Sequence, residues 1–490
     1  MTPEERQMMP WGGFGGGPTA SAFSPIALLL VLLAGILIWL LPRAKTIAPF
    51  FLASMLIPTN QIIVINGLHF SMLKILALFA MVRVAWAKVV GKEPVFSGGI
   101  NGIDAAMLIL TVFTAIDGVL LWRAWGEFVF QMGQIYTPFG VYFLLRFLIR
   151  DEEDVKRTLR VWAWVAVAIA AVMICEQLTG RNPVYAALGG AENVQNDLVS
   201  VFVRGNGLRS KGTFEHPLLA GTFGAISLPL FVGLWWKEKK DRMVSAMGIV
   251  SAVVIAVTAG SSTGLLGLVA GIVGLCFWVF RRQMRVIRWG IVGMLVSLHL
   301  VMNGPVWALI NRMDVTGDSS ADHRFGIVDN CIRHFWDWAL IGTKDYGNWG
   351  WDMFDLSNQY VATADGSGLI PLIGLLAIFV YGFKYLGKTR RAAEGDTRSE
   401  WFIWAAGSAL FANAVSMFGV AYWDQICVAW YATLAIISAM TLSVRAAPLA
   451  QPSLTINPSP VRYATSAIGV QRGLNRGALK RGHSDPVASP

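Results

Sequence analysis

The sequence has few charged residues: 14% of its 490 side chains are Asp, Glu, Lys or Arg, whereas 55% are hydrophobic. A soluble domain carries about 25% charged residues because its surface faces water. The mean hydropathy is +0.55, so most side chains are well solvated only if lipid forms part of their surroundings. The composition therefore excludes an ordinary soluble protein and predicts an integral membrane protein.

Cysteine is also scarce, with four scattered residues and no Cys-x-x-Cys or Cys/His spacing of a metal site. Neither a disulfide framework nor a zinc site is expected. The sequence lacks a GxxxxGK[ST] phosphate loop, a GxSxG nucleophile elbow, an HExxH zinc helix and an Asp-x-Asp pair in an outer loop. ATP-driven and metal-dependent mechanisms have no support, and we expect neither a metal ion nor a cofactor.

The net charge is +10, but Lys and Arg occur in short clusters between apolar runs. This distribution follows the positive-inside rule and does not predict a nucleic-acid-binding patch. Five basic stretches mark the cytoplasmic side: 146–160, 237–242, 281–288, 388–398 and the tail after 445. Alternation across the bilayer places three segments on the outer side: 178–216, the turn at 260–264 and a long loop at about 304–366.

Apolar segments recur along the chain and predict an all-α bundle of about 12–13 transmembrane helices. They lie at about 26–41, 47–65, 70–88, 104–121, 127–149, 158–177, 217–236, 243–259, 263–280, 287–302, 368–387, 401–420 and 424–444. The run at 47–65 is the weakest because Pro49 and Pro58 interrupt it. Glu4 and Glu5 oppose a cleavable signal peptide, so the first run is expected to remain as a helix.

We expect a membrane domain over 26–445, with the large loop 304–366 inside it, between tails over 1–25 and 446–490. The last segment is rich in Pro, Ser, Gly and Arg and has no apolar period. Such a segment cannot bury enough surface to order itself, so both tails are predicted to be disordered. The orientation places the C-terminal tail in the cytoplasm.

The long outer loop is predicted to contain an amphipathic helix of about four turns. Its start resembles a capping box, Ser319-Ser-Ala-Asp322, and Gly342 is expected to end it. The apolar face consists of Phe325, Val328, Ile332 and Phe335. An i, i+4 charge ladder on other faces consists of Asp329, Arg333 and Asp337.

Two groups of cations fall on the outer side. The first, between Arg204 and His216, places Arg209 and Lys211 just before a predicted helix. Guanidinium groups and the amides of a helix N-terminus form a natural diphosphate site, although the cations could simply solvate a loop near lipid headgroups. The second is Asp322-His323-Arg324. An Arg in a first helical turn opposes the helix dipole, so either an anionic ligand or an ion pair with an Asp would explain it.

Two polar groups without cations also fall on the outer side. Gly260-Ser-Ser262-Thr-Gly264 could bind a phosphate or a sugar, or it could be a turn that satisfies helix ends. Ser357-Asn358-Gln-Tyr360 could orient a sugar hydroxyl, or it could form an interfacial cap. Ionisable residues inside apolar runs are further candidates, although snorkelling explains most of them: Lys74, Arg83, Asp117, Glu127, Arg146 and Glu176.

In their order and separation, five motifs resemble those of the O-antigen ligase and polymerase family of bacterial membrane glycosyltransferases, over about residues 200–380. They are Arg209-Ser-Lys-Gly-Thr-Phe-Glu-His-Pro217, Ser261-Ser-Thr-Gly264, Asp322-His-Arg324-Phe, Ile341-Gly342, and Asn358 before Gly-Leu-Ile-Pro-Leu-Ile-Gly. The resemblance implies a bundle of about twelve helices in the bacterial inner membrane, with the large loop in the periplasm. It also implies metal-independent glycosyl transfer there from an undecaprenyl-diphosphate-linked glycan.

The resemblance further implies roles for individual residues. Arg209 and Arg324 would be catalytic and stabilise the diphosphate leaving group. The substrate-binding set would be Arg204, Lys211, His216, Ser262, His323, Asn358 and Tyr360. Thr263 stands where the family often has Arg. Ser357 stands where the ligases carry a His, and this favours a polysaccharide polymerase over a lipid A core ligase.

Two alternatives remain open: an O-antigen ligase-like transferase with another acceptor, and a transporter of lipid-linked glycans. Transporters tend to place charges at the membrane midplane on broken helices, often in inverted repeats. Here the charges gather on the outer side and the sequence has no internal repeat, so transfer is favoured over transport. The expected partners are the lipid-linked glycan, the bilayer and other polysaccharide-assembly proteins, and no nucleic acid.

Overall fold

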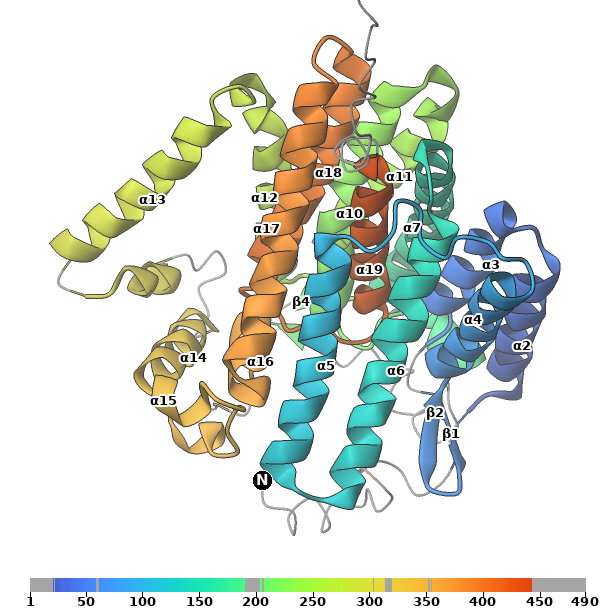
Figure 1. The fold of residues 1–490 in the computed structure, drawn as a ribbon, viewed down its shortest axis with the longest axis horizontal. Coiled ribbons are helices and arrows are strands. Elements are labelled where there is room, and N and C mark those ends of the chain that lie inside the picture. Colours follow the sequence, from blue (N-terminus) through green and yellow to red (C-terminus); the bar gives the residue numbers. More distant parts are fainter. Residues whose placement is uncertain are drawn as a thin grey trace, which may run out of the picture. The chain divides into compact units, whose positions relative to one another are not determined.

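The computed structural model describes residues 21, 23–58, 61–189, 203–204, 207–302, 304–312, 320–350, 353 and 355–442. Nearly all of the N-terminal tail and the whole of the 446–490 tail lie outside these residues. Within the described part the chain is mostly helical, as the sequence predicts, with two short antiparallel hairpins (Figure 1).

Among the described residues, seven helices are long and apolar enough to cross a membrane, which supports a multi-pass membrane protein. They are α5 (Gly102–Trp122), α7 (Glu152–Thr179), α10 (Pro217–Lys237), α11 (Arg242–Thr258) with η1 (Lys239–Asp241), α12 (Ser262–Cys276) with η2 (Phe277–Phe280), α13 (Met284–Val301) and α17 (Leu369–Ala392). Shorter apolar helices are α2 (Pro25–Leu40) and α19 (Gln425–Met440). The other long helices are α3 (Arg43–Leu56), α4 (Met72–Val89), α6 (Trp125–Leu148) and α18 (Thr397–Ser416). Each predicted apolar segment overlaps one of these helices, although the bounds differ by several residues in places.

The prediction of a single helix over 47–65 is wrong for the second half of this range. Helix α3 ends at Leu56, and β1 (Ile62–Ile65) pairs with β2 (Leu68–Ser71) as an antiparallel hairpin. Asn66 and Gly67 have positive φ angles of 50° and 78°. A two-residue turn of this left-handed kind matches the twist of a hairpin, so the local Asn-Gly signal prevails over the apolar run.

Helix α10 is the most enclosed of the seven candidate spans, because 83% of its most apolar 18-residue stretch is buried. Small residues let its neighbours approach: a Cβ at Gly224 would lie 2.5 Å from the Ala252 carbonyl oxygen of α11. A Cβ at Gly221 would lie 3.3 Å from the Gly264 Cα of α12. Close backbone approach of this kind gives membrane helices their packing contacts, and it fixes the N-terminal ends of α10 and α12 side by side.

The predicted outer loop folds into several short helices around a small core. They are η3 (Val306–Arg312), α14 (Ser320–Arg333), α15 (Phe335–Trp338), η4 (Tyr346–Asn348) and α16 (Gln359–Ser367). The predicted amphipathic helix is confirmed, but α14 ends at Arg333 and a second short helix follows. Its buried face also differs from the prediction: Ile327 is fully buried, whereas Ile332 is 45% exposed, because Ile327 packs in a core with α16.

The predicted charge ladder forms only in part. Arg333 Nε donates to Asp329 Oδ2 at 2.6 Å, as the i, i+4 spacing predicts. Asp337 lies instead 2.8 Å from His334 Nδ1, because the helix breaks between α14 and α15 and the next turn no longer continues the same face.

Arg146 does not snorkel to a membrane surface, which corrects the simpler expectation for this residue. Its side chain is fully buried, and its guanidinium donates to both carboxylate oxygens of Asp104 at 2.8 and 3.0 Å. The Tyr142 hydroxyl donates to the same carboxylate. A buried charge requires such a partner because its desolvation is costly, so this network joins α5 to α6.

Candidate functional site

A buried carboxylate organises the segment that leads into α10. Glu176 Oε2 accepts hydrogen bonds from the backbone amides of Lys211 (3.1 Å) and Gly212 (2.9 Å). Asn182 Nδ2 donates to the same oxygen at 3.2 Å. Gly212 has a φ of 62°, a conformation that favours glycine. Glu176 is fully buried, so it is a structural acceptor for this loop and not a snorkelling side chain.

Lys211 is held inside the same segment. It is 5% exposed, and its ammonium lies 4.0 Å from the centroid of the Tyr185 ring, which is a cation–π contact. The Tyr185 hydroxyl donates to the carbonyl oxygen of Phe214 at 3.1 Å. A positive charge is therefore fixed just before the N-terminus of α10, where the helix dipole adds to it.

Arg209 packs on the turn between α11 and α12. Its Nε donates to the Ala259 carbonyl oxygen at 3.3 Å, and the backbone amide of Ser210 donates to the Thr258 carbonyl oxygen at 3.0 Å. Gly260 has a φ of 55°, and a Cβ there would lie 3.0 Å from Arg209 Cγ. The glycine thus lets the arginine stem lie against the turn.

Arg324 reaches the same turn from α14. Its Nη2 donates to Ser262 Oγ at 3.2 Å and to Thr263 Oγ1 at 2.9 Å. Thr263 Oγ1 in turn donates to the Gly419 carbonyl oxygen at 3.0 Å. We refer to residues 259–263, which comprise the turn after α11 and the first two residues of α12, as the α11–α12 turn. Arg209 and Arg324, from two segments distant in sequence, both hydrogen-bond to this turn.

His216 caps α10 and interacts electrostatically with the nearby cations. Its Nδ1 accepts a hydrogen bond from the Leu218 amide at 3.1 Å. Burial, together with the positive charges of Arg209 and Lys211, lowers the pKa of His216 to about 4. The ring is therefore neutral at physiological pH, mainly because burial disfavours its charged form.

Asp424 is a site residue that sequence analysis missed. The Glu215 amide donates to Asp424 Oδ2 at 3.2 Å, and the adjacent Trp423 ring lies 6.4 Å from the His216 ring, centroid to centroid. Asp424 has a φ of 62°, which is strained for a residue with a side chain. Its only sequence signal is an acidic residue at the start of the predicted apolar run 424–444.

Asn358 and Tyr360 belong to the supporting structure. Asn358 Oδ1 accepts from the amides of Tyr360 (3.0 Å) and Val361 (3.2 Å), while its Nδ2 donates to the Phe418 carbonyl oxygen at 3.3 Å. The Tyr360 hydroxyl donates to the Ala414 carbonyl oxygen at 2.9 Å. Asn358 thus forms the cap considered from the sequence, and both residues hold α16 against the segment that contacts Thr263.

The other predicted site residues lie as follows. Ser262 is 5% exposed and accepts from Arg324, and His323 is half-buried next to Arg324 on α14. Arg204 lies in β3 (Val203–Arg204), which pairs with β4 (Gly207–Leu208), and its side chain lies outside the described residues. Among the residues that the structure describes, no group of three His, Cys, Asp or Glu could hold a metal ion.

Gly342 joins the predicted loop to α16 and α17. It has a φ of 84°, and a Cβ there would lie 2.8 Å from the Asp365 carbonyl oxygen. The Thr343 amide donates to that oxygen at 2.8 Å, and the Leu369 amide donates to the Ala339 carbonyl oxygen at 3.0 Å. Only glycine fits this close approach, so backbone packing explains the glycine of the Ile341-Gly342 motif.

The sequence matches no protein-family model and no curated protein. The site must therefore be interpreted from its own geometry. Two guanidinium groups and a buried ammonium gather near the N-terminal ends of α10 and α12. Such a concentration of positive charge and helix N-termini suits an anion with several oxygens, above all a phosphate or diphosphate.

Proposed function

We propose that this protein is a membrane glycosyltransferase that polymerises glycan repeat units carried on undecaprenyl diphosphate, at the periplasmic face of a bacterial inner membrane. The observation that carries the proposal is the convergence of Arg209 and Arg324 on the α11–α12 turn. The resemblance of the motifs over about 200–380 to the O-antigen ligase and polymerase family supports the same conclusion.

The proposed reaction needs stabilisation of a leaving group. The acceptor hydroxyl oxygen forms a bond to the anomeric carbon of the donor, and the bond from that carbon to the diphosphate oxygen breaks. The electron pair goes to the diphosphate, whose negative charge increases. Preorganised guanidinium groups stabilise charge as it develops, and their planar forks match phosphate oxygens.

The proton of the acceptor hydroxyl requires an acceptor of its own. Asp424 is suited to this role, because a carboxylate is a general base and it adjoins the Glu215–His216 segment. His216 is less suited, since its Nδ1 already accepts a backbone hydrogen bond and its lowered pKa of about 4 makes it a weak base. Trp423 is 38% exposed beside them and offers an apolar face on which a sugar ring could stack.

The acceptor distinguishes a polymerase from a ligase. Ser357 occupies the position where the ligases have a His, and the neighbouring Asn358 is 2% exposed and engaged in capping α16. This favours a growing glycan as acceptor. Ligase-like transfer to another acceptor uses the same donor chemistry and is the alternative.

The proposal can be tested by introducing arginine substitutions into the chromosomal copy of the gene. Arg209→Ala and Arg324→Ala should each shorten or abolish the surface polysaccharide, because loss of one preorganised donor typically costs about 10²–10³ in rate. Chain length is read on gels beside the protein level in membranes. Arg181→Ala and Arg333→Ala are matched controls, since both side chains are exposed, the first near the same segment and the second on α14. Unchanged polymer in the first two variants, at normal protein level, would refute the proposal.

A binding measurement separates donor recognition from the identity of the sugar. Purified protein in nanodiscs should bind undecaprenyl diphosphate more tightly than undecaprenyl monophosphate, and Arg209→Ala or Arg324→Ala should remove the difference. Equal binding of both lipids by the unaltered protein would contradict a diphosphate site.

A further inference from the structure

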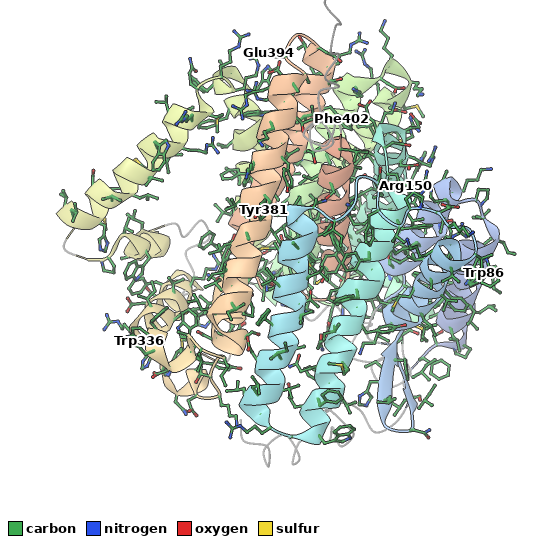
Figure 2. All side chains as sticks on the ribbon, in the orientation of Figure 1. Trp86, Arg150, Trp336, Tyr381, Glu394 and Phe402 are labelled. Carbon is green, nitrogen blue, oxygen red and sulfur yellow. The ribbon has the colours of Figure 1, made fainter. Side chains whose placement is uncertain are left out.

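Three large apolar side chains are exposed on the segment that comprises α14, α15 and the turn after α15. Ile332, Trp336 and Leu340 follow one another at intervals of four residues and are 45%, 87% and 80% exposed. Figure 2 places Trp336 at the margin of this segment, away from α16. The opposite side is buried: Ile327 and Trp338 pack in the core shared with α16. A segment that is apolar on two sides is unusual in water and points to a second apolar neighbour.

The last of these residues, Leu340, lies near the start of a candidate membrane span. Helix α17 exposes Ile370, Ile373 and Leu376 on one side, with exposures of 43%, 54% and 45%. Leu340 adjoins the start of this surface, because a Cβ at Gly368 would lie 2.9 Å from the Leu340 carbonyl oxygen. Since α17 is one of the candidate membrane spans, Leu340 lies near the point where α17 would enter a bilayer.

We propose that Ile332, Trp336 and Leu340 form a lipid-docking surface that inserts into the headgroup region of the leaflet where α17 begins. We call these three residues the lipid-docking row. Tryptophan prefers this interface because its ring is apolar and its N–H is polar. In this arrangement Arg333 and Asp337, whose side chains are 71% and 58% exposed, lie beside the three apolar residues on the face that stays in water. An apolar face beside charged residues is the pattern of an interfacial helix.

The docking row has a consequence for the site. Arg324 lies on the same helix as Ile332 and hydrogen-bonds to the α11–α12 turn. Lipid contact gives α14 an anchor in addition to this turn and to the core around Ile327. The bilayer therefore helps to hold Arg324 in place, which goes beyond the proposed glycosyl transfer and does not depend on it.

Site-directed labelling in nanodiscs tests the proposal without any substrate. Trp336→Cys and Leu340→Cys are labelled with the environment-sensitive fluorophore NBD in a Cys276→Ser background, because Cys276 is an exposed native cysteine. Asp337→Cys is the matched control on the same segment. The labelled background alone corrects for the remaining cysteines.

We expect the labels at 336 and 340 to show blue-shifted emission, quenching by lipids with a nitroxide near the headgroup, and several-fold slower reduction by aqueous dithionite than the label at 337. Equal dithionite rates at all three positions would overturn the proposal. Slow reduction without quenching by the nitroxide lipids would also overturn it, because protein and not lipid would then cover the row.

Discussion

Arg324 donates a hydrogen bond to the hydroxyl of Thr263 at 2.9 Å, although 61 residues separate them in sequence. The same hydroxyl donates to the carbonyl oxygen of Gly419. One threonine thus connects α14, the α11–α12 turn and the segment between α18 and α19. It orients the guanidinium that the proposed reaction requires.

Thr263→Val should reduce polymer synthesis by about 10- to 100-fold. The substitution keeps the shape but removes the nearer of the two hydroxyl acceptors of Arg324, and a hydrogen bond to a charged group contributes about 1.5–3 kcal/mol. The rate of polymer formation in membranes, normalised to protein level, provides the measurement. Thr258→Val is the matched control, since its hydroxyl donates within α11 to the Val254 carbonyl oxygen. Equal loss in both variants would indicate a general packing defect.

The buried Asp365 should make stability depend on pH. Its side chain is fully buried, and within the described part of the chain neither oxygen accepts a hydrogen bond from nitrogen or oxygen. Burial raises its pKa from 3.8 to about 7, and the nearby Cys331 thiol and His334 oppose the rise. Because the folded state favours the neutral acid, this contribution to stability is complete below pH 3.8 and is lost as the pH rises through about 7.

We therefore expect the melting temperature of the unaltered protein in nanodiscs to decline between pH 5 and pH 8 more steeply than that of Asp365→Asn. Asparagine keeps the size of the side chain and does not ionise. Differential scanning fluorimetry of the two proteins at each pH supplies the comparison. Parallel curves would show that Asp365 does not titrate in this range.

The lowered pKa of His216 predicts an opposite dependence. The folded state favours the neutral ring, so this contribution is present above the unfolded pKa of 6.5 and is lost as the pH falls towards about 4. His216→Asn keeps an N-cap acceptor and removes the titration. The melting temperature of the unaltered protein minus that of His216→Asn should therefore fall as the pH is lowered from 7 to 4. A difference that does not vary with pH would contradict the shift.

Gly342→Ala should loosen the outer loop. The new Cβ would meet the Asp365 carbonyl oxygen at 2.8 Å in a backbone with a φ of 84°, so we expect a loss of about 1–3 kcal/mol in the stability of this segment. Hydrogen exchange of the α14–α16 amides measures it. Gly326→Ala on α14 is the control, because among the described atoms nothing lies within 4 Å of its Cβ. Faster exchange in the control alone would refute the argument.

The positions of the helices could be read from the sequence, because hydrophobic runs and capping residues act over a few neighbouring positions. The Asn358 cap and the Asp329–Arg333 pair are examples, since both partners lie within one helical turn. There are exceptions. Asn66-Gly67 forms a hairpin turn where a helix was predicted. The buried face of α14 also differs from the prediction, but the cause there is tertiary packing, because Ile327 lies in the core shared with α16.

Tertiary structure alone decided which distant groups meet. Nothing in the spacing indicates that Glu176 accepts the amides of Lys211 and Gly212, that Arg146 pairs with Asp104, or that Asp424 reaches Glu215. These contacts depend on the path of the chain between elements and on which helix backbones can approach, as the glycines of α10 allow. The sequence by itself determined an apolar, many-helix protein with cations clustered between its apolar runs, and only the packing of α10, α12 and α14 brought Arg209 and Arg324 to one turn.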